Sequence, residues 1–174
     1  MGFNWYDESI KIFVQKKILT EISLYFGKVN MPKGFEIEQD ILCDDILKSN
    51  QTDSEFPFSR NWDKLNTYII EHINLEHEIK LVNRKTWGDM YKSGHISQPL
   101  AEIDPVDFVL LYGVKTNNCS VRFHYNDNRK KIRTWKVDLK DNCFILFPSN
   151  CLYYIQNKQD NSLNYIQTIL YDYI

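Results

Sequence analysis

The spacing of apolar residues changes near residue 78, and the two parts of the chain predict different elements. From Asp7 to Gly27 we predict a helix, capped by Asp7 and ended by Gly27. Apolar side chains recur there at every fourth position: Ile10, Val14, Ile18, Ile22 and Phe26. This spacing is typical of one face of a helix. A strand is the alternative, because Ile10, Ile12 and Val14 also stand at alternate positions.

Three further features precede residue 78. Residues 35–37 predict a short strand. Residues 48–60 are polar and contain a proline, which predicts a surface loop. A second helix is predicted after this loop, capped by Ser59 or Asn61 and ending near Asn74. One face of this helix carries its apolar residues: Leu65, Tyr68, Ile69 and Ile73.

Beyond Glu78, short runs rich in Val, Ile, Phe, Tyr and Trp alternate with polar turn clusters. The runs are 77–87, 107–114, 119–125, 133–139, 142–149, 152–157 and 164–174. Strands at such short, regular spacing are typical of an antiparallel sandwich or barrel. We therefore predict an α+β, mainly β fold: a jelly roll with N-terminal helices. One domain is expected over residues 1–174, with a helical part at 1–77 and a jelly-roll part at 78–174.

The last predicted strand, Leu163 to Tyr171, is apolar on both faces. A strand of this kind is either buried on both sides within its own chain or paired with another subunit. The sequence alone does not decide between these two possibilities. The second leads us to expect a protein partner or a homo-oligomer.

Composition narrows the classes of function. The chain has 174 residues, of which 43% are hydrophobic and 14% aromatic, and its net charge is −2. These fractions suit a packed core, and the charge disfavours nucleic acid or an anionic membrane as a partner. No apolar run approaches the roughly 20 residues of a transmembrane helix. The N-terminus lacks the features of a secretory signal, so we expect a cytoplasmic protein.

Four cysteines occur, and none has the spacing of a metal site. They are Cys43, Cys119, Cys143 and Cys151. We interpret them as buried, reduced thiols. The sequence also lacks the G-x-S-x-G motif of hydrolases and the Walker A motif of nucleotide-binding proteins.

The order of features from Trp87 to the C-terminus points to a known family. Trp87 is followed by Gly94, by the runs DFVLLYGV and CSVRFHYND, and by the segment KDNCFILFPS. In that segment an acidic turn leads into a strand that ends at Phe147-Pro148-Ser149. This set resembles phage-encoded and bacterial iron(II)/2-oxoglutarate oxygenases, whose fold is a double-stranded β-helix related to the jelly roll. The resemblance covers about the last half of the chain.

The resemblance implies where the site of that family falls on this chain. The family's metal ligands, two histidines and a carboxylate, fall at Leu100, Glu102 and Tyr153. Its arginine for 2-oxoglutarate falls near Asn164. Leucine has no lone pair to donate, tyrosine titrates near 10, and asparagine lacks the charged fork of arginine. Leu100 and Tyr153 would fill the former metal cavity. We therefore predict a non-catalytic jelly-roll protein without metal or cofactor, which serves as a binding or structural component.

An active oxygenase with displaced ligands is the alternative, and it alone would use iron(II) and 2-oxoglutarate. His95, Glu102 and His124 would then form the metal site, close to Tyr153. Glu102 also forms an acidic pair with Asp104, which we interpret as part of a solvated loop.

The basic run 128–133 supports a third interpretation. Beside Tyr125 and Trp135, it suits the binding of single strands or a glycan. The simpler interpretation, a charged hairpin turn that protects a sheet edge, agrees better with the negative net charge. We interpret His72 and His77 as solvated. Together with the resemblance, a composition rich in Asn, Lys and Ile suggests a phage protein of the virion or host cytoplasm.

Overall fold

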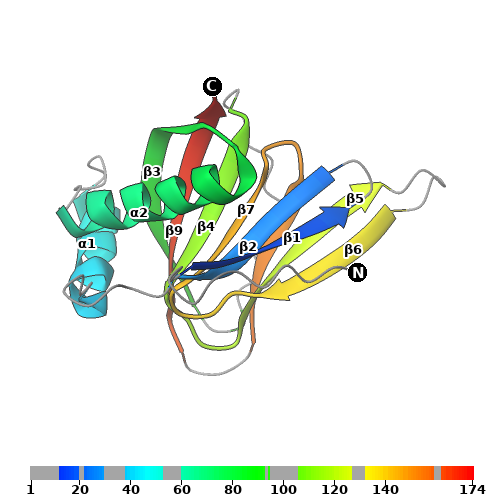
Figure 1. The fold of residues 1–174 in the computed structure, drawn as a ribbon. Coiled ribbons are helices and arrows are strands. Elements are labelled where there is room, and N and C mark those ends of the chain that lie inside the picture. The colour runs from blue at the N-terminus through cyan, green and yellow to red at the C-terminus, as the bar shows by residue number, and fades with distance from the viewer. Residues whose placement is uncertain are drawn as a thin grey trace.

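The computed structural model describes residues 12–19, 22–29, 38–52, 60–92, 94, 106–126, 132–158 and 162–174. In this part of the chain, two helices and nine strands form a mainly β fold (Figure 1). The helices are α1 (Gln39–Thr52) and α2 (Arg60–His77). The strands are β1 (Ile12–Leu19), β2 (Ile22–Val29), β3 (Leu81–Tyr91), β4 (Phe108–Lys115), β5 (Cys119–Asn126), β6 (Ile132–Asp138), β7 (Cys143–Pro148), β8 (Leu152–Asn157) and β9 (Asn164–Tyr173).

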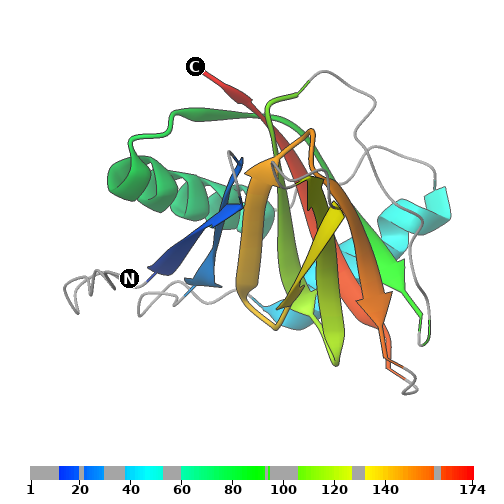
Figure 2. The ribbon, with the colours of Figure 1, turned by 90° about the vertical axis from the view of Figure 1, so that its right-hand side faces the viewer.

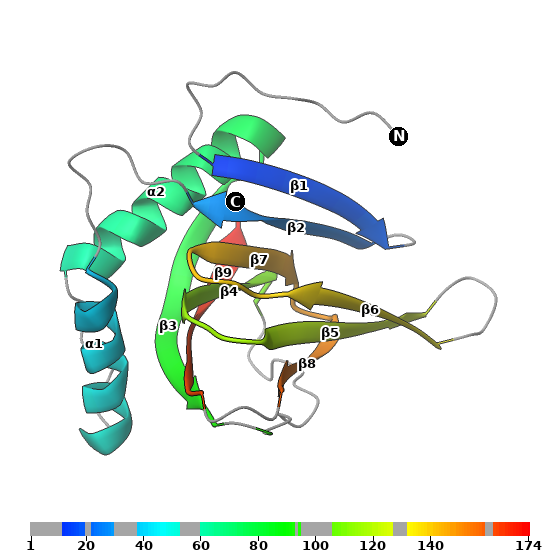
Figure 3. The same cartoon turned by 90° about the horizontal axis from the view of Figure 1, so that it is seen from below.

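The strands form two antiparallel sheets that pack face to face. The larger sheet has the order β1-β2-β7-β4-β9-β3, and the smaller has the order β6-β5-β8. Both helices lie on one side of the larger sheet, and the smaller sheet lies on its other side (Figure 3). Figure 2 shows the same sheets from the side of the smaller sheet, with α1 behind the strands. This arrangement is that of a double-stranded β-helix and confirms the predicted fold class.

Alternate side chains of the larger sheet enter two separate cores. On β9, Ile166 and Leu170 pack between the two sheets, whereas Ile169 and Tyr171 pack beneath the helices. This division follows from the two-residue period of a strand, which points successive side chains to opposite faces. The space between the sheets is the one that positions the candidate site.

The last predicted strand could be buried within its own chain or paired with another subunit, and the structure shows the first. β9 lies between β4 and β3, and its residues from Ile166 to Tyr171 are all buried. The strand is therefore buried on both sides within its own chain, and its apolar faces need no second subunit. The other runs predicted as strands beyond Glu78 are also confirmed, as β3 to β8.

The predicted helix from Asp7 to Gly27 is wrong. The described part of this segment forms the hairpin β1–β2, in which Leu19 pairs with Ile22. An every-fourth spacing also places side chains on one face of a strand, because four is a multiple of the strand period of two. Pairing of β2 with β7, as in Tyr25 opposite Leu146, selects the strand. The part of the chain before residue 78 therefore contains two strands as well as two helices.

The first helix, α1, lies partly where we predicted a loop. Residues 48–52 of the predicted loop belong to α1, and residues 53–59 lie outside the described residues, as does the predicted strand at 35–37. Leu42, Cys43 and Ile46 form the buried face of α1, and their helical spacing was the signal that the sequence offered.

The second helix is confirmed. In α2, Leu65, Ile69 and Ile73 are fully buried, and the helix continues three residues past Asn74 to His77. Glu78 ends it in the left-handed region, at φ 54°, with its N–H donating to the Asn74 carbonyl. Neither this helix nor any other in the described residues is long and apolar enough to cross a membrane.

Candidate functional site between the sheets

The inward face of β3 carries an unusual row of side chains. Trp87 and Tyr91 pack into the core between the sheets, and Asp89 shares their face because it lies two residues from each. β3 is an edge strand of the larger sheet among the described strands. The indole Nε1 of Trp87 donates a hydrogen bond of 2.9 Å to Asp89 Oδ2. A half-buried carboxyl group therefore lies between two aromatic side chains on this face.

Burial governs the protonation of the groups around Asp89. It raises the pKa of the Asp89 carboxyl, and the hydrogen bond from Trp87 lowers that pKa only in part. Burial also raises the pKa of the Tyr91 phenol, as do the nearby acidic groups Asp89, Tyr153 and Cys119. The pKa of the Cys119 thiol rises to about 12, mainly through burial. At neutral pH these phenol and thiol groups stay protonated, so Cys119 is not an activated nucleophile.

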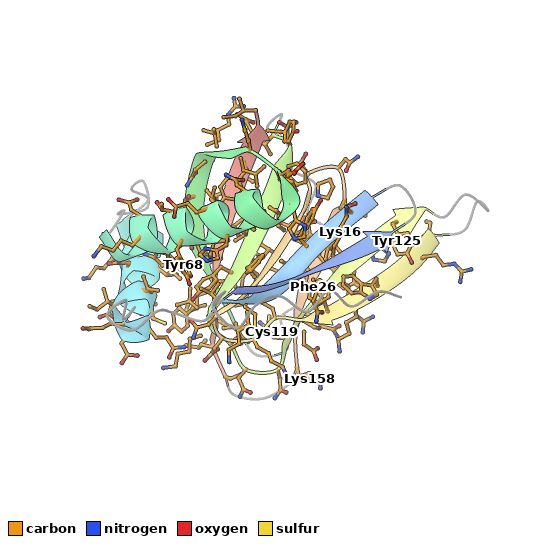
Figure 4. The ribbon with its side chains drawn as sticks, in the orientation of Figure 1. Lys16, Phe26, Tyr68, Cys119, Tyr125 and Lys158 are labelled. Carbon is orange, nitrogen blue, oxygen red and sulfur yellow. The ribbon has the colours of Figure 1, made fainter. Side chains whose placement is uncertain are left out.

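Two asparagines complete the polar end of this space. Asn164, at the start of β9, lies directly opposite Tyr91, and its Oδ1 accepts a hydrogen bond from the Asn117 N–H. Asn157, at the end of β8, donates from Nδ2 to the Lys92 carbonyl at 3.1 Å. Both side chains are buried. Figure 4 marks this end of the molecule by Cys119, where β5 begins, and by Lys158, just after β8.

Tyr153 lies further along the same inward face, on β8. Its side chain is 3% exposed, and its ring contacts Phe147 edge-on, with 4.8 Å between the centroids. The ring of Phe123 lies 6.4 Å away on β5. Tyr153 is thus part of an aromatic cluster that joins the two sheets.

The other residues singled out in the sequence are placed as follows. Leu100, Glu102, His95 and Asp104 lie outside the described residues. His124 alternates with the inward-facing Phe123, so it lies on the outer face of the smaller sheet. There its ring stacks on Tyr154, with 5.2 Å between centroids. The structure therefore does not place His124 on the face that carries Tyr153.

The interpretation of His72 and His77 as solvated groups is wrong. His72 is half-buried, with Nδ1 2.9 Å from the Tyr68 carbonyl oxygen. His77 is half-buried against Tyr25, at a ring distance of 4.8 Å, and its burial lowers the pKa of its imidazole. His77 thus packs the end of α2 against β2, whereas the contacts of His72 lie within α2.

The four cysteines are free thiols, three of them buried and Cys143 half-buried, which agrees with the interpretation from the sequence. Of the basic run, residues 128–131 lie outside the described residues, while Ile132 and Arg133 begin β6. β6 forms one edge of the smaller sheet. The basic run, which we interpreted as a charged hairpin turn, leads into this edge strand.

Of the positions that the resemblance indicates for iron and 2-oxoglutarate, the structure describes Tyr153 and Asn164. Neither side chain fits the role that the resemblance implies: Tyr153 is a packed phenol in place of an imidazole, and Asn164 is a neutral amide in place of a guanidinium. Among the described residues, no three His, Cys, Asp or Glu side chains gather as a metal-binding group.

No protein-family model matches this chain, and no curated protein sequence matches it. Solved structures do. A prolyl-4-hydroxylase from Pseudomonas putida superposes with a TM-score of 0.60 at 10% identity, covering 86% of this chain and 87% of that one. A Trichoplax adhaerens prolyl hydroxylase, solved with a hypoxia inducible factor peptide, gives 0.57 at 13% identity, covering 86% and 83%. The non-heme alpha ketoglutarate dependent carbocyclase SnoK gives 0.58 at 4% identity, covering 85% and 78%.

These similarities confirm the resemblance at the level of the fold. At such low identity they show a shared double-stranded β-helix across most of the chain and leave the chemistry of this chain to its own residues. Asp89, Tyr91 and Asn157 were not among the site residues predicted from the sequence. The alternation of Trp87, Asp89 and Tyr91 within one strand was the available signal, because it places a carboxyl between two aromatics on one face.

Proposed function

We propose that this protein is a non-catalytic member of the double-stranded β-helix fold that works as a binding or structural module. The observation that supports the proposal most is the packing of Tyr153 against Phe147 and Phe123. An iron ligand must present a lone pair to an open coordination position. A phenol held within an aromatic cluster instead contributes core volume.

The charge of the interior supports the same proposal. 2-Oxoglutarate carries two carboxylates, and no guanidinium stands at Asn164 to pair with one of them. Asp89 and Asn164 occupy diagonal positions on neighbouring strands, a separation of about 7–8 Å. At that separation an ionised Asp89 would repel a bound carboxylate by about 2 kcal/mol at an effective dielectric constant of roughly 20. The interior therefore disfavours a dianion.

Metal content tests the proposal. The purified full-length protein is incubated anaerobically with iron(II) and 2-oxoglutarate, desalted and analysed for iron. We expect substoichiometric iron that does not increase when 2-oxoglutarate is added. One equivalent of iron retained only in the presence of 2-oxoglutarate would refute the proposal. That result would favour the alternative, an active oxygenase whose displaced ligands include His95 and Glu102.

We further propose a phage origin and a role in the virion or in the host cytoplasm. The resemblance to phage-encoded oxygenases and the Asn-, Lys- and Ile-rich composition support this origin. The neighbourhood of the gene tests it directly. Flanking genes for capsid or tail proteins are expected, and a chromosomal operon of metabolic enzymes would contradict the phage origin.

A further inference from the structure

The outer face of the smaller sheet is turned away from both described helices, which lie on the far side of the larger sheet (Figure 3). On β5 and β8, the inward-facing Phe123 and Tyr153 alternate with side chains that point outward. Four of the outward side chains, each half-buried or exposed, form what we call the outer-face cluster: Arg122, His124, Lys136 and Tyr154.

Two rings of the outer-face cluster form a stack. His124 on β5 and Tyr154 on β8 have ring centroids 5.2 Å apart and planes inclined by 24°. On the other side of His124, the Thr134 hydroxyl oxygen lies 3.4 Å from the imidazole Nδ1. Each stacked ring meets the other through one face, so a flat partner can continue the stack. Aromatic rings on an open sheet face are a surface on which the unstacked bases of a single strand bind.

Two cations lie beside this stack. Arg122 is the register partner of Tyr154 on one side and of Lys136 on the other. Like charges directly opposite one another destabilise a strand pair, so a bound anion would relieve this row. Asp138 lies 3.8 Å from the Lys136 ammonium group, but both side chains are exposed and such a pair is weak. The ion pairs among the described residues do not include Arg122, whose guanidinium suits a phosphate.

The net charge of −2 is unevenly distributed along the chain. From the start of β5 to the end of β6, basic residues outnumber acidic ones: Asp127 and Asp138 stand against Arg122, Arg129, Lys130, Lys131, Arg133 and Lys136. The helix α1 has the opposite balance, with Asp40, Asp44 and Asp45 against Lys48. Because a polyanion responds to a local basic patch, a slightly acidic chain can still bind one at the smaller sheet.

We propose that the outer-face cluster binds single-stranded nucleic acid, with bases stacked on His124 and Tyr154 and backbone phosphates at Arg122 and Lys136. An acidic protein segment would neutralise the cations but would offer the two rings no flat partner. A duplex would offer phosphates but keeps its bases stacked inside. The inference rests on the proposed function, because it names the partner of the binding module.

Fluorescence anisotropy of the full-length protein tests the proposal. The probes are labelled oligouridine and oligothymidine of about 12 nucleotides, a DNA duplex of the same length and an oligoglutamate peptide. At about 50 mM salt we expect the single strands to bind with a dissociation constant of about 10 μM or tighter. The duplex and the peptide should bind at least about tenfold more weakly, because neither supplies both a stacked base and a phosphate.

Two substitutions separate stacking from charge. Tyr154→Leu should weaken binding of the single strands about fivefold or more, because a ring that stacks on a base is lost. Arg122→Gln should weaken binding and reduce the slope of log affinity against log salt concentration by about 0.7. The matched controls Tyr173→Leu and Lys64→Gln change exposed residues outside the smaller sheet and should leave binding unchanged. Circular dichroism shows that each variant is folded before titration.

The outcomes distinguish this inference from the proposed function. If no single strand binds at about 100 μM protein, the inference is overturned, while a protein that also retains no iron keeps its proposed function. Equal binding of the duplex or the peptide would show that charge acts without stacking, contrary to the inference. Unchanged binding by Tyr154→Leu and Arg122→Gln would place the site elsewhere and also overturn it. Stoichiometric iron retained with 2-oxoglutarate would refute the proposed function, whichever nucleic acid binds.

Discussion

Tyr153 on β8 packs edge-on against Phe147 on β7, and this contact joins the smaller sheet to the larger one. The space between the sheets holds a hydrophobic core to which both residues belong. The proposal of a non-catalytic protein depends on this packing, because volume committed to the core is not available to a metal.

Removing the Tyr153 ring should destabilise the fold. For Tyr153→Ala we expect the free energy of unfolding to fall by about 3 kcal/mol, as for other large aromatic residues deleted from a core. Urea denaturation of both proteins measures this difference. Tyr173→Ala is the matched control, because Tyr173 is 58% exposed and its loss should cost about 0.5 kcal/mol or less. Similar losses for the two variants would show that Tyr153 does not serve the core.

Asp89 should make stability decrease as the pH rises. Because burial raises the pKa of the folded-state carboxyl above its ordinary value of 3.8, the folded protein holds this proton more tightly than the unfolded chain does. The stabilising contribution is complete below pH 3.8 and is lost as the pH rises through the folded-state pKa. Asp89→Asn should therefore be more stable than the wild type at pH 7, with a smaller gain at pH 4.

Denaturation of both proteins at these two pH values measures the effect, with Asp63→Asn as the exposed control. A wild-type protein that gains stability relative to Asp89→Asn between pH 4 and pH 7 would show that the carboxylate is stabilised when charged, contrary to the burial described here.

The cysteines should differ in reactivity. Burial raises the pKa of the Cys43 and Cys151 thiols to about 11 and that of Cys119 to about 12. The half-buried Cys143 also has a raised pKa, but Lys28 and Lys140 partly offset the effect of burial. At pH 8 we expect iodoacetamide to modify Cys143 first in the native protein and all four in denaturant, as read by peptide mass spectrometry. Fast modification of Cys119 in the native state would contradict the closed packing around Tyr91.

We propose that the protein forms an oligomer through a surface other than β9, because β9 is covered within its own chain. Ile132, on the edge strand β6, is 73% exposed and is a candidate contact. We expect light scattering at micromolar concentration to show an oligomer that Ile132→Lys dissociates and Val82→Lys, at a 46% exposed site on β3, does not. A monomeric wild-type protein would rule out the homo-oligomer.

Most of the strands could be predicted from the sequence because the residues within each strand are sufficient to identify it as a strand. β9 is a clear case, since an apolar run on both faces requires a central position in a sheet. The hairpin β1–β2 was missed because an every-fourth spacing fits both a helix and a strand, and pairing with β7, far along the chain, decides between them. Local pattern carries no information about such a partner.

The candidate site was less predictable than the fold. The order of motifs pointed to Tyr153 and Asn164 by resemblance, and both side chains are buried. For Asp89 the sequence offers only its alternation with Trp87 and Tyr91, which places the carboxyl between two aromatics on one face. That this face is the one directed between the sheets depends on the register that sets Asp89 opposite Ile166 on β9, which local sequence does not contain.

The most direct test of the central claim is an anaerobic titration of the purified protein with iron(II) and 2-oxoglutarate, followed by visible absorption. An active oxygenase of the same fold serves as the positive control and should show the charge-transfer band of 2-oxoglutarate bound to iron. For this protein we predict no such band at any ratio of the two additives. A saturable band reaching one equivalent of each would contradict the account.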